Sequence, residues 1–404
     1  MTKAGVDVLV VGAGPAGSAT TWHLARQGYR VVAVDRATFP REKACSEYMS
    51  PEAVRLLDRL GVVPTLEAAG AAPLYGTTVI GPAGSRLTGL FALAGVTLTR
   101  NAGFSIARRI LDQQLVDAAR SAGGEVLDGV GLEALLYENG AVGGAVLRDA
   151  AGRRRTIRAR LTVGADGLRS VVARRIGRRT HGRPSRMAFV AHVTGVPGMG
   201  DVAEMHVGRS GYVGLNRLGK GVTNVALVVP RSLAGQAKGR ATTFFQEQLE
   251  LFPGVRGRVP RDGIVREVLV TGPFAAWSGR VVTDGALLVG DAADFFDPFT
   301  GEGIYSALRG AELAADAAVE ALHRPGQVAA YRLAGYVGAR RRAFAGKWAL
   351  ERLIGYAMLL PPLFDRAVER LERRGLAHTL IGATGDLLPA SEVLHPGFLA
   401  RMVL

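Results

Sequence analysis

Three glycines close to the N-terminus have the spacing that binding of a pyrophosphate requires. Gly12, Gly14 and Gly17 form G-x-G-x-x-G directly after the apolar run 6–11. The first glycine permits a tight turn, the second lets the backbone approach a pyrophosphate, and the third lets helix and strand pack closely. The helix that follows would point its N-terminal N–H groups at the phosphates. The pattern predicts a dinucleotide site.

An acidic residue follows at the distance that such a site needs. The apolar run 29–34 ends at Asp35, 18 residues after Gly17. A carboxylate there can accept hydrogen bonds from ribose hydroxyls. Strand, helix and acid together make the motif far more specific than the glycines alone, but they do not distinguish FAD from NAD(P).

A second glycine-rich turn, "GDAADFFDPFTGEGI", follows the apolar run 286–289. We expect a strand that delivers Asp291 and a helix that starts near Gly303. The positive end of that helix would stabilise negative charge on a ligand. Side chains at 301 and 303 would obstruct a flat ligand lying against the turn, which explains glycine at both positions.

Four stretches resemble motifs of FAD-dependent monooxygenases and reductases of the p-hydroxybenzoate hydroxylase superfamily, and they follow one another along the chain in the order found in that superfamily. Besides the two above, "IARRILDQQL" resembles their Arg-x-x-x-Asp helix start, with Arg108 and Asp112, and "LTVGADGLRS" resembles their Asp-Gly motif, with Asp166. The resemblance implies FAD as the cofactor. No second G-x-G-x-x-G is present, so NAD(P)H would bind transiently as reductant, unless a separate protein supplies the electrons.

Within that superfamily the chain resembles the geranylgeranyl reductase family. "FPREKACSEY" resembles its Pro-Arg-x-Lys-x-Cys-Gly segment, with Pro40, Arg41, Lys43 and Cys45 at matching positions, and "PFTGEGI" resembles its Pro-x-x-Gly-Glu-Gly turn. The resemblance implies that Cys45 lies near the flavin and takes part in redox chemistry. A small buried cysteine without chemistry is the alternative.

The substrate side departs from that family. Tyr212 matches its Tyr-x-Trp-x-Phe-Pro stretch, but Gly214, Asn216 and Arg217 replace Trp, Phe and Pro. Ser46-Glu47 also replaces a glycine pair after the cysteine. The flavin site is therefore retained, whereas the substrate pocket has changed. The Trp-x-Trp-x-Ile-Pro signature of flavin halogenases is absent.

These motifs define a predicted site. The candidate catalytic residues are Cys45 and Tyr212. The candidate FAD-binding residues are Gly12, Gly14, Pro15, Ala16, Gly17, Asp35, Arg36, Arg41, Lys43, Ala44, Cys45, Arg108, Asp166, Gly290, Asp291, Pro298, Gly301, Glu302, Gly303 and Ile304. One cysteine and scattered histidines predict no metal site.

The predicted function is a FAD-dependent oxidoreductase that acts on a hydrophobic small molecule. It would reduce or dehydrogenate C=C/C–C bonds in the manner of geranylgeranyl reductases. The alternative is a FAD-dependent aromatic hydroxylase of a phenolic or quinone-type substrate, which the small Gly214 and the polar Asn216 favour.

The composition is that of an ordinary globular protein, with 48% hydrophobic and 21% charged residues among 404. A single cysteine excludes an internal disulfide and suits the cytoplasm. The net charge of +15 is compatible with a solvated basic surface and with contact to a membrane surface. No nucleic-acid module is visible. The uncharged run 353–364 is shorter than the roughly 20 residues of a spanning helix. The oligomeric state stays open.

The predicted fold is α/β, because apolar runs of strand length alternate with helical patterns. A Rossmann-like FAD-binding domain (1–75, 100–183 and 270–328) is interleaved with a smaller antiparallel-sheet substrate domain (76–99 and 184–269). A C-terminal helical segment (329–404) follows, either as a lid over an apolar tunnel or as plain core packing.

Overall fold

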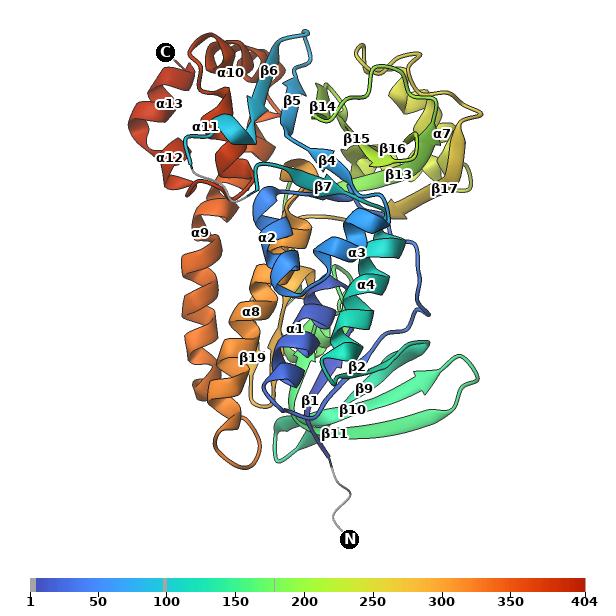
Figure 1. Cartoon of the computed structure of the whole chain (residues 1–404), viewed down its shortest axis with the longest axis vertical. Helices are drawn as coiled ribbons and strands as arrows, with labels where there is room; N and C mark the ends of the chain where they lie inside the picture. The colour runs from blue at the N-terminus through green and yellow to red at the C-terminus, as the bar shows by residue number, and fades with distance from the viewer. Residues whose placement is uncertain (1–4, 97–99, 178, 404) are drawn as a thin grey trace.

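The computed structural model describes residues 5–96, 100–177 and 179–403 (Figure 1). Its largest sheet has the order β19-β20-β11-β1-β2-β8, with β10 and β9 continuing from β11. The strands from β20 to β8 are parallel, whereas β19, β10 and β9 pair in antiparallel fashion. Their bounds are β1 (Val6–Val11), β2 (Val31–Val34), β8 (Glu125–Leu127), β9 (Val130–Glu138), β10 (Ala141–Asp149), β11 (Arg154–Gly164), β19 (Val282–Thr283) and β20 (Ala286–Leu288).

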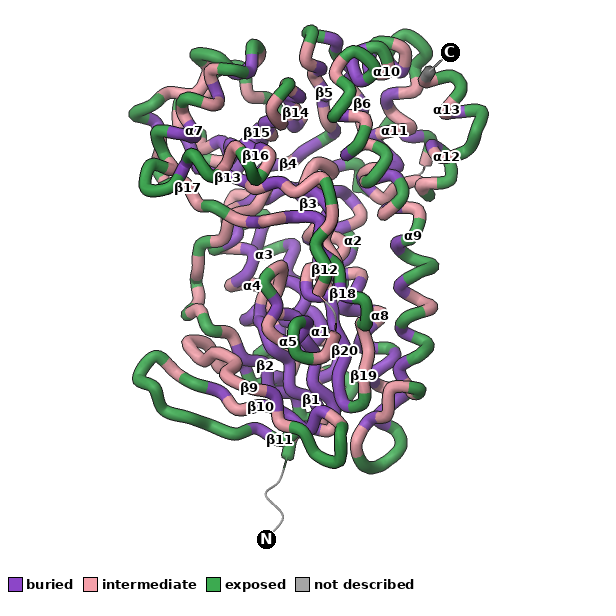
Figure 2. The backbone as a smooth tube through the Cα atoms, turned by 180° about the vertical axis from the view of Figure 1, so that it is seen from behind, coloured by how far each residue is buried: buried purple, intermediate pink, exposed green. Residues whose placement is uncertain are grey.

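The central strand β1 is apolar on both faces because each face meets a different core. Val8 and Val10 pack with the helices, whereas Leu9 and Val11 pack on the side of β9 and β10. Figure 2 shows the buried residues concentrated around this strand. The helices of the flavin half are α1 (Pro15–Arg26), α2 (Pro51–Arg59), α3 (Val63–Ala68), α4 (Arg108–Ser121), α5 (Val171–Ile176) and α8 (Gly303–Leu322). The predicted Rossmann-type α/β fold is confirmed.

A second sheet has the order β17-β13-β16-β15-β14-β5-β6. One face packs against α7 (Ala241–Leu249) through Phe244 and Phe245, and the other faces the cavities described below. The pairing is antiparallel, as predicted, except that β14 and β5 are parallel. The β5–β6 hairpin comes from an earlier segment of the chain than the rest of this sheet. The bounds are β5 (Gly76–Ile80), β6 (Arg86–Leu90), β13 (Arg186–Thr194), β14 (Ala203–Gly208), β15 (Gly211–Gly219), β16 (Val222–Pro230) and β17 (Ile264–Thr271).

The C-terminal region is helical. The long helix α9 runs beside α8, and the later helices gather next to β6 at one end of the molecule (Figure 1). The break before α10 falls at Pro361-Pro362, since proline suits the first turn of a helix but not its interior. The bounds are α9 (Ala334–Ala357), α10 (Pro361–Arg373), α11 (Ala377–Thr384), α12 (Ser391–Leu394) and α13 (Pro396–Val403).

Short elements complete the chain. They are β3 (Tyr48–Met49), β4 (Ala72–Leu74), β7 (Gly103–Ser105), β12 (Arg179–His181), α6 (Arg231–Ala234), β18 (Ala276–Ser278) and β21 (Asp294–Phe295). Within the described residues, no helix combines the length and hydropathy needed to cross a bilayer. The predicted domain boundaries stay predictions, and their parts at 1–4, 97–99, 178 and 404 lie outside the described residues.

Candidate flavin and substrate site

The turn between β1 and α1 is built from contacts that only glycine permits. Gly12 has φ +100°, and a Cβ there would clash with the Ala165 carbonyl oxygen. A Cβ on Gly17 would clash with the carbonyl oxygen of Gly12. At Gly14 an added Cβ would meet side chains instead, 3.3 Å from Arg41 Nη2 and 4.0 Å from Arg108 Nη2. Two guanidinium groups therefore face the N-terminus of α1.

These two arginines are held in place by one buried carboxylate. Arg108 Nε and Nη2 donate to Asp112 Oδ1 and Oδ2, each at 2.8 Å. Arg41 Nη1 lies 3.0 Å from Asp112 Oδ2. Since one carboxylate meets two guanidinium groups, a positive charge is left at the positive end of the α1 dipole. This arrangement suits an anion such as a diphosphate.

The residues after this turn surround a central cavity of ≈ 150 Å³. Lys43, from the "FPREKAC" segment, and Asp291, from the second glycine-rich turn, both line this cavity. Burial lowers the pKa of Lys43, and the positive charge of Arg108 lowers it further, whereas burial raises the pKa of Asp291. No hydrogen bond from any described residue satisfies the Asp291 carboxylate. The cavity therefore holds an acceptor ready for ligand hydroxyls.

Cys45 also lines this cavity and is followed by an unusual residue. Glu47 is buried with φ +58°, a conformation that favours glycine. Its carboxylate accepts from Arg108 N at 2.9 Å, lies 2.6 Å from His192 Nε2 and lies 3.6 Å from Arg266 Nη1. The Glu47 N–H points at Cys45 Sγ, at 3.3 Å. The left-handed backbone would suit a glycine at this position, and the carboxylate contacts offset the strain of about 1–3 kcal/mol.

Tyr212 lines the cavity with its ring, but its hydroxyl is already engaged. The hydroxyl donates to Asp297 Oδ1 at 2.6 Å, and Arg186 Nη1 contacts Asp297 Oδ2 at 2.6 Å. Arg186 Nη2 also donates to the Gly355 carbonyl at 3.1 Å. Burial, together with the negative charge of Asp297, raises the pKa of Tyr212 well above its usual value. This buried cluster ties the second sheet to the glycine-rich turn and to α9.

Glu302, predicted as a cofactor-binding residue, directs its carboxylate toward Ser50 and lies outside the lining of the central cavity. Ser50 Oγ donates to Glu302 Oε2 at 3.1 Å, and Lys347 Nζ lies 4.0 Å from the same oxygen and 2.5 Å from Asp386 Oδ2. Burial raises the pKa of both carboxyl groups. The Lys347 ammonium therefore lies near two buried carboxyl groups, those of Glu302 and Asp386.

The predicted site residues fall into two groups, those that line the central cavity and those that do not. Those lining the central cavity are Gly14, Pro15, Ala16, Lys43, Ala44, Cys45, Arg108, Tyr212, Asp291, Pro298, Gly301, Gly303 and Ile304. Those outside its lining are Gly12, Gly17, Asp35, Arg36, Arg41, Asp166, Gly290 and Glu302.

Several of the outlying residues support the site from behind. Asp35 Oδ2 accepts from Ala13 N at 2.9 Å, inside the glycine turn. Asp166 accepts from Val171 N at 2.6 Å at the start of α5. Arg36 lines a separate surface hollow.

At Gly301, φ is +75° and an added Cβ would lie 2.6 Å from the Tyr48 ring, so the backbone itself requires glycine there.

Sequence reasoning missed the residues that act across the fold, namely Glu47, Arg179, Arg186, His192, Arg266 and Asp297. Arg179 donates to the Asp291 carbonyl at 2.8 Å and so fixes the strand end. The one available signal was Glu47, a carboxylate in place of an expected glycine.

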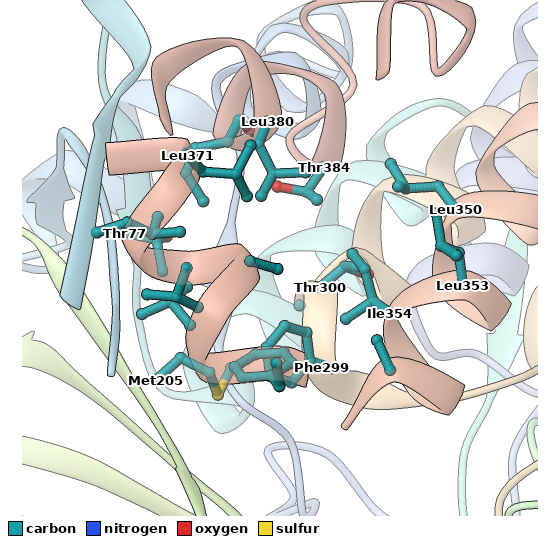
Figure 3. A pocket seen from close by; sticks show the side chains of 18 of the residues that line it. Thr77, Met205, Phe299, Thr300, Leu350, Leu353, Ile354, Leu371, Leu380 and Thr384 are labelled. Carbon is teal, nitrogen blue, oxygen red and sulfur yellow. Dashed lines mark hydrogen bonds between the residues drawn. The ribbon is translucent and has the colours of Figure 1, made fainter. Parts of the chain in front are cut away.

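A larger apolar cavity of ≈ 400 Å³ adjoins the central one. Its walls come from the second sheet, the glycine-rich turn and the helices α9 to α13, and Figure 3 shows side chains of this lining pointing inward. The residues that line both cavities are Ser46, Met205, Gly214, Pro298 and Gly301. The sequence left the role of the C-terminal helices open between a lid and core packing. The structure places them as walls of this cavity.

The central cavity fits FAD by its own chemistry. The glycine turn leaves the backbone open beside two guanidinium groups, and Asp291 faces the cavity without a donor. The Pro298–Gly301 turn lies beside α8, whose N-terminus would stabilise negative charge on an isoalloxazine. Residues of both sheets and of α1 and α8 would thus hold the cofactor.

Asp291→Ala is expected to weaken FAD binding roughly ten- to a hundredfold, about 1.5–3 kcal/mol, because ligand hydroxyls lose a charged acceptor. The apoprotein should stay folded, since the substitution removes a carboxylate that burial already disfavours. Asp291→Asn keeps an acceptor oxygen and should lose less. Titration of apoprotein by flavin fluorescence measures both. An alanine variant that retains its FAD through extended dialysis would contradict this role.

Comparison with known proteins agrees with this site. The family model described as FAD binding domain matches residues 5–347. Digeranylgeranylglycerophospholipid reductase 2 of Methanothermobacter thermautotrophicus is 30% identical over 377 residues, which cover 91% of each chain.

Two solved structures share the fold. A flavoprotein/dehydrogenase from Cytophaga hutchinsonii superposes with a TM-score of 0.83 at 19% identity, covering 99% of this chain and 97% of that one. A geranylgeranyl bacteriochlorophyll reductase-like protein from Thermoplasma acidophilum gives 0.78 at 21% identity, covering 98% of both.

Proposed function

The chain belongs to the FAD binding domain family, and on that premise we propose that it saturates C=C bonds in the isoprenoid part of a lipid. It is a FAD-dependent oxidoreductase. A related protein of similar length is a digeranylgeranylglycerophospholipid reductase, which supports the choice of substrate.

The observation that carries the proposal is the apolar cavity next to the flavin cavity. Its ≈ 400 Å³ are lined by leucine, isoleucine, valine and phenylalanine from the C-terminal helices and the second sheet. A pocket of this size and polarity suits a hydrocarbon chain, because its lining offers few polar partners. The shared lining residues would bring one section of that chain to the cofactor.

Two amide groups near this junction donate to protein partners. Asn216 Nδ2 donates to Ser105 Oγ at 2.5 Å, and Asn224 Nδ2 donates to the Ser46 carbonyl at 2.8 Å. They therefore fix the Cys45 segment and the wall of the cavity. When bound and reduced, FAD supplies two electrons as a hydride, and a proton completes saturation of the double bond. The chain's residues position the substrate and exclude water.

The test is anaerobic turnover of a geranylgeranyl-bearing glycerophospholipid with chemically reduced enzyme. The expected product gains two hydrogens per reduced C=C, as read by mass spectrometry. Unchanged lipid, with FAD bound and reduced, would refute the proposal. We also propose NAD(P)H as the transient reductant in the cell and a cytoplasmic location, which the single cysteine favours.

Hydroxylation of a planar aromatic is the second candidate. Gly214 supports it, because among the described residues an added Cβ there would meet only Met205, at 3.6 Å. The position therefore leaves room between the cavities. A hydroxylase would add one oxygen atom to the substrate under air, traceable with isotopically labelled O₂. No labelled product and a saturated lipid would exclude it.

Cys45→Ser is expected to reduce turnover of the lipid at least about tenfold, or about 1.4 kcal/mol of transition-state stabilisation, if the thiol takes part in reduction. The fold and FAD content should not change, since serine is nearly isosteric and can keep the contact with the Glu47 N–H. Steady-state rates at equal FAD occupancy measure the effect. Turnover within about twofold of wild type would remove Cys45 from the mechanism and favour oxygen insertion.

A further inference from the structure

The turn between α9 and α10 exposes a group of large apolar side chains. Leu353, Tyr356, Leu359, Leu360 and Leu363 are 36%, 49%, 54%, 56% and 39% exposed. They lie within the uncharged run 353–364. Single, scattered apolar side chains are normal on a protein surface, whereas contiguous exposed ones of this kind mark interaction sites. We name these five residues the turn patch.

The turn patch is also the mouth of the apolar cavity. Leu353, Tyr356, Leu360 and Leu363 line that cavity and at the same time meet solvent. In Figure 3, Leu353 lies on α9 beside Leu350 and Ile354, at the wall of the pocket. A hydrocarbon chain that entered here would pass from the patch directly into the interior.

Three exposed arginines lie next to the patch. Arg352 and Arg366 are exposed and flank it along the chain, and exposed Arg183 is attached to it because its carbonyl accepts from the Tyr356 hydroxyl at 3.0 Å. Among the described residues, none of these arginines forms an ion pair. The nearby Asp365 is buried and accepts from Ser85 Oγ at 2.6 Å.

Apolar side chains flanked by arginines without an ion-pair partner suit an anionic lipid surface. There the apolar side chains enter the acyl boundary, and the arginines contact the headgroups. We propose that the turn patch docks the protein on an anionic bilayer, with the cavity mouth opening toward the lipid. The inference deepens the proposed function, because a lipid substrate could then move from bilayer to cavity without crossing water.

Sedimentation with vesicles tests the docking without any turnover. Wild-type holoenzyme should bind phosphatidylcholine vesicles that contain phosphatidylglycerol about tenfold more than pure phosphatidylcholine vesicles, and added salt should weaken this binding. Leu359→Asp should reduce the bound fraction at least about fivefold. Leu359 does not line the cavity, so its FAD content and its turnover of detergent-dispersed lipid should match wild type.

The matched control is Leu251→Asp. Leu251 lies just after α7 and is 57% exposed, as against 54% for Leu359. Its replacement should leave vesicle binding unchanged. Docking is refuted if wild type binds neither vesicle, if Leu359→Asp binds normally, or if both variants lose binding equally. A dimer that Leu359→Asp dissociates would instead assign the patch to a second copy of the chain. Vesicle binding without lipid reduction would refute only the proposed function.

Discussion

Arg186→Met should lower the free energy of unfolding by about 3–5 kcal/mol, because it leaves the Asp297 carboxylate buried without its cation. Arg186 and Asp297 are 4% and 5% exposed, so water cannot replace the lost contact. The variant also loses the bond to the Gly355 carbonyl, through which β13 holds α9. Since Asp297 precedes the Pro298–Gly301 turn, FAD should dissociate at lower denaturant than in wild type.

Tyr212→Phe is the matched comparison. It removes one hydrogen bond to Asp297 and leaves the ion pair, so a loss of about 1–3 kcal/mol is expected. Guanidinium unfolding followed by circular dichroism and by flavin fluorescence measures both variants. Equal losses in the two would show that the cation is not the dominant partner of Asp297. The same Tyr212 variant also tests the predicted catalytic role, because unchanged turnover would make Tyr212 purely structural.

Gly17→Ala should abolish retention of FAD during purification. The added methyl group would clash with the Gly12 carbonyl oxygen. The clash cannot relax easily, because Gly12 directly follows β1 and Gly17 lies within α1. The turn must open, which separates the α1 N-terminus from the position where a diphosphate would lie. Overpacking of this kind costs about 1–3 kcal/mol in stability. The distorted turn additionally weakens the binding of FAD. The absorbance ratio of flavin to protein reports the loss.

Gly335→Ala is its control within another helix. Among the described residues, no atom outside the adjoining backbone of α9 lies within 4 Å of an added Cβ at Gly335. Alanine there should be neutral or stabilise α9 by up to about 1 kcal/mol, since glycine is a weak helix former. Full FAD occupancy in Gly17→Ala would mean that the turn relaxes without disturbing the site.

The sequence predicted those parts of the site that neighbouring residues determine. Gly12 and Gly17 act within one strand–turn–helix unit, so their spacing alone indicated the turn. The start of α4 at Arg108 and of α8 at Gly303 followed from short motifs in the same way.

The remainder depends on contacts between distant segments, which spacing does not encode. Glu47 meets His192 across 145 residues, and Asp297 meets Arg186 across 111. Glu302 shows the opposite case, in which a motif residue turns away from the cavity because Ser50 and Lys347 receive its side chain. The parallel pairing of β14 with β5 likewise requires knowledge of where the early hairpin docks.

The order in which the walls of the central cavity appear during synthesis has a consequence for the cell. Its lining runs from Gly14 to Ala307, and β1 pairs with β11, which in turn pairs with β20. The lining of the cavity is therefore complete only once α8 has been synthesised. Before that point α1 lacks the apolar surface of α8 against which it packs, and such exposed faces promote aggregation.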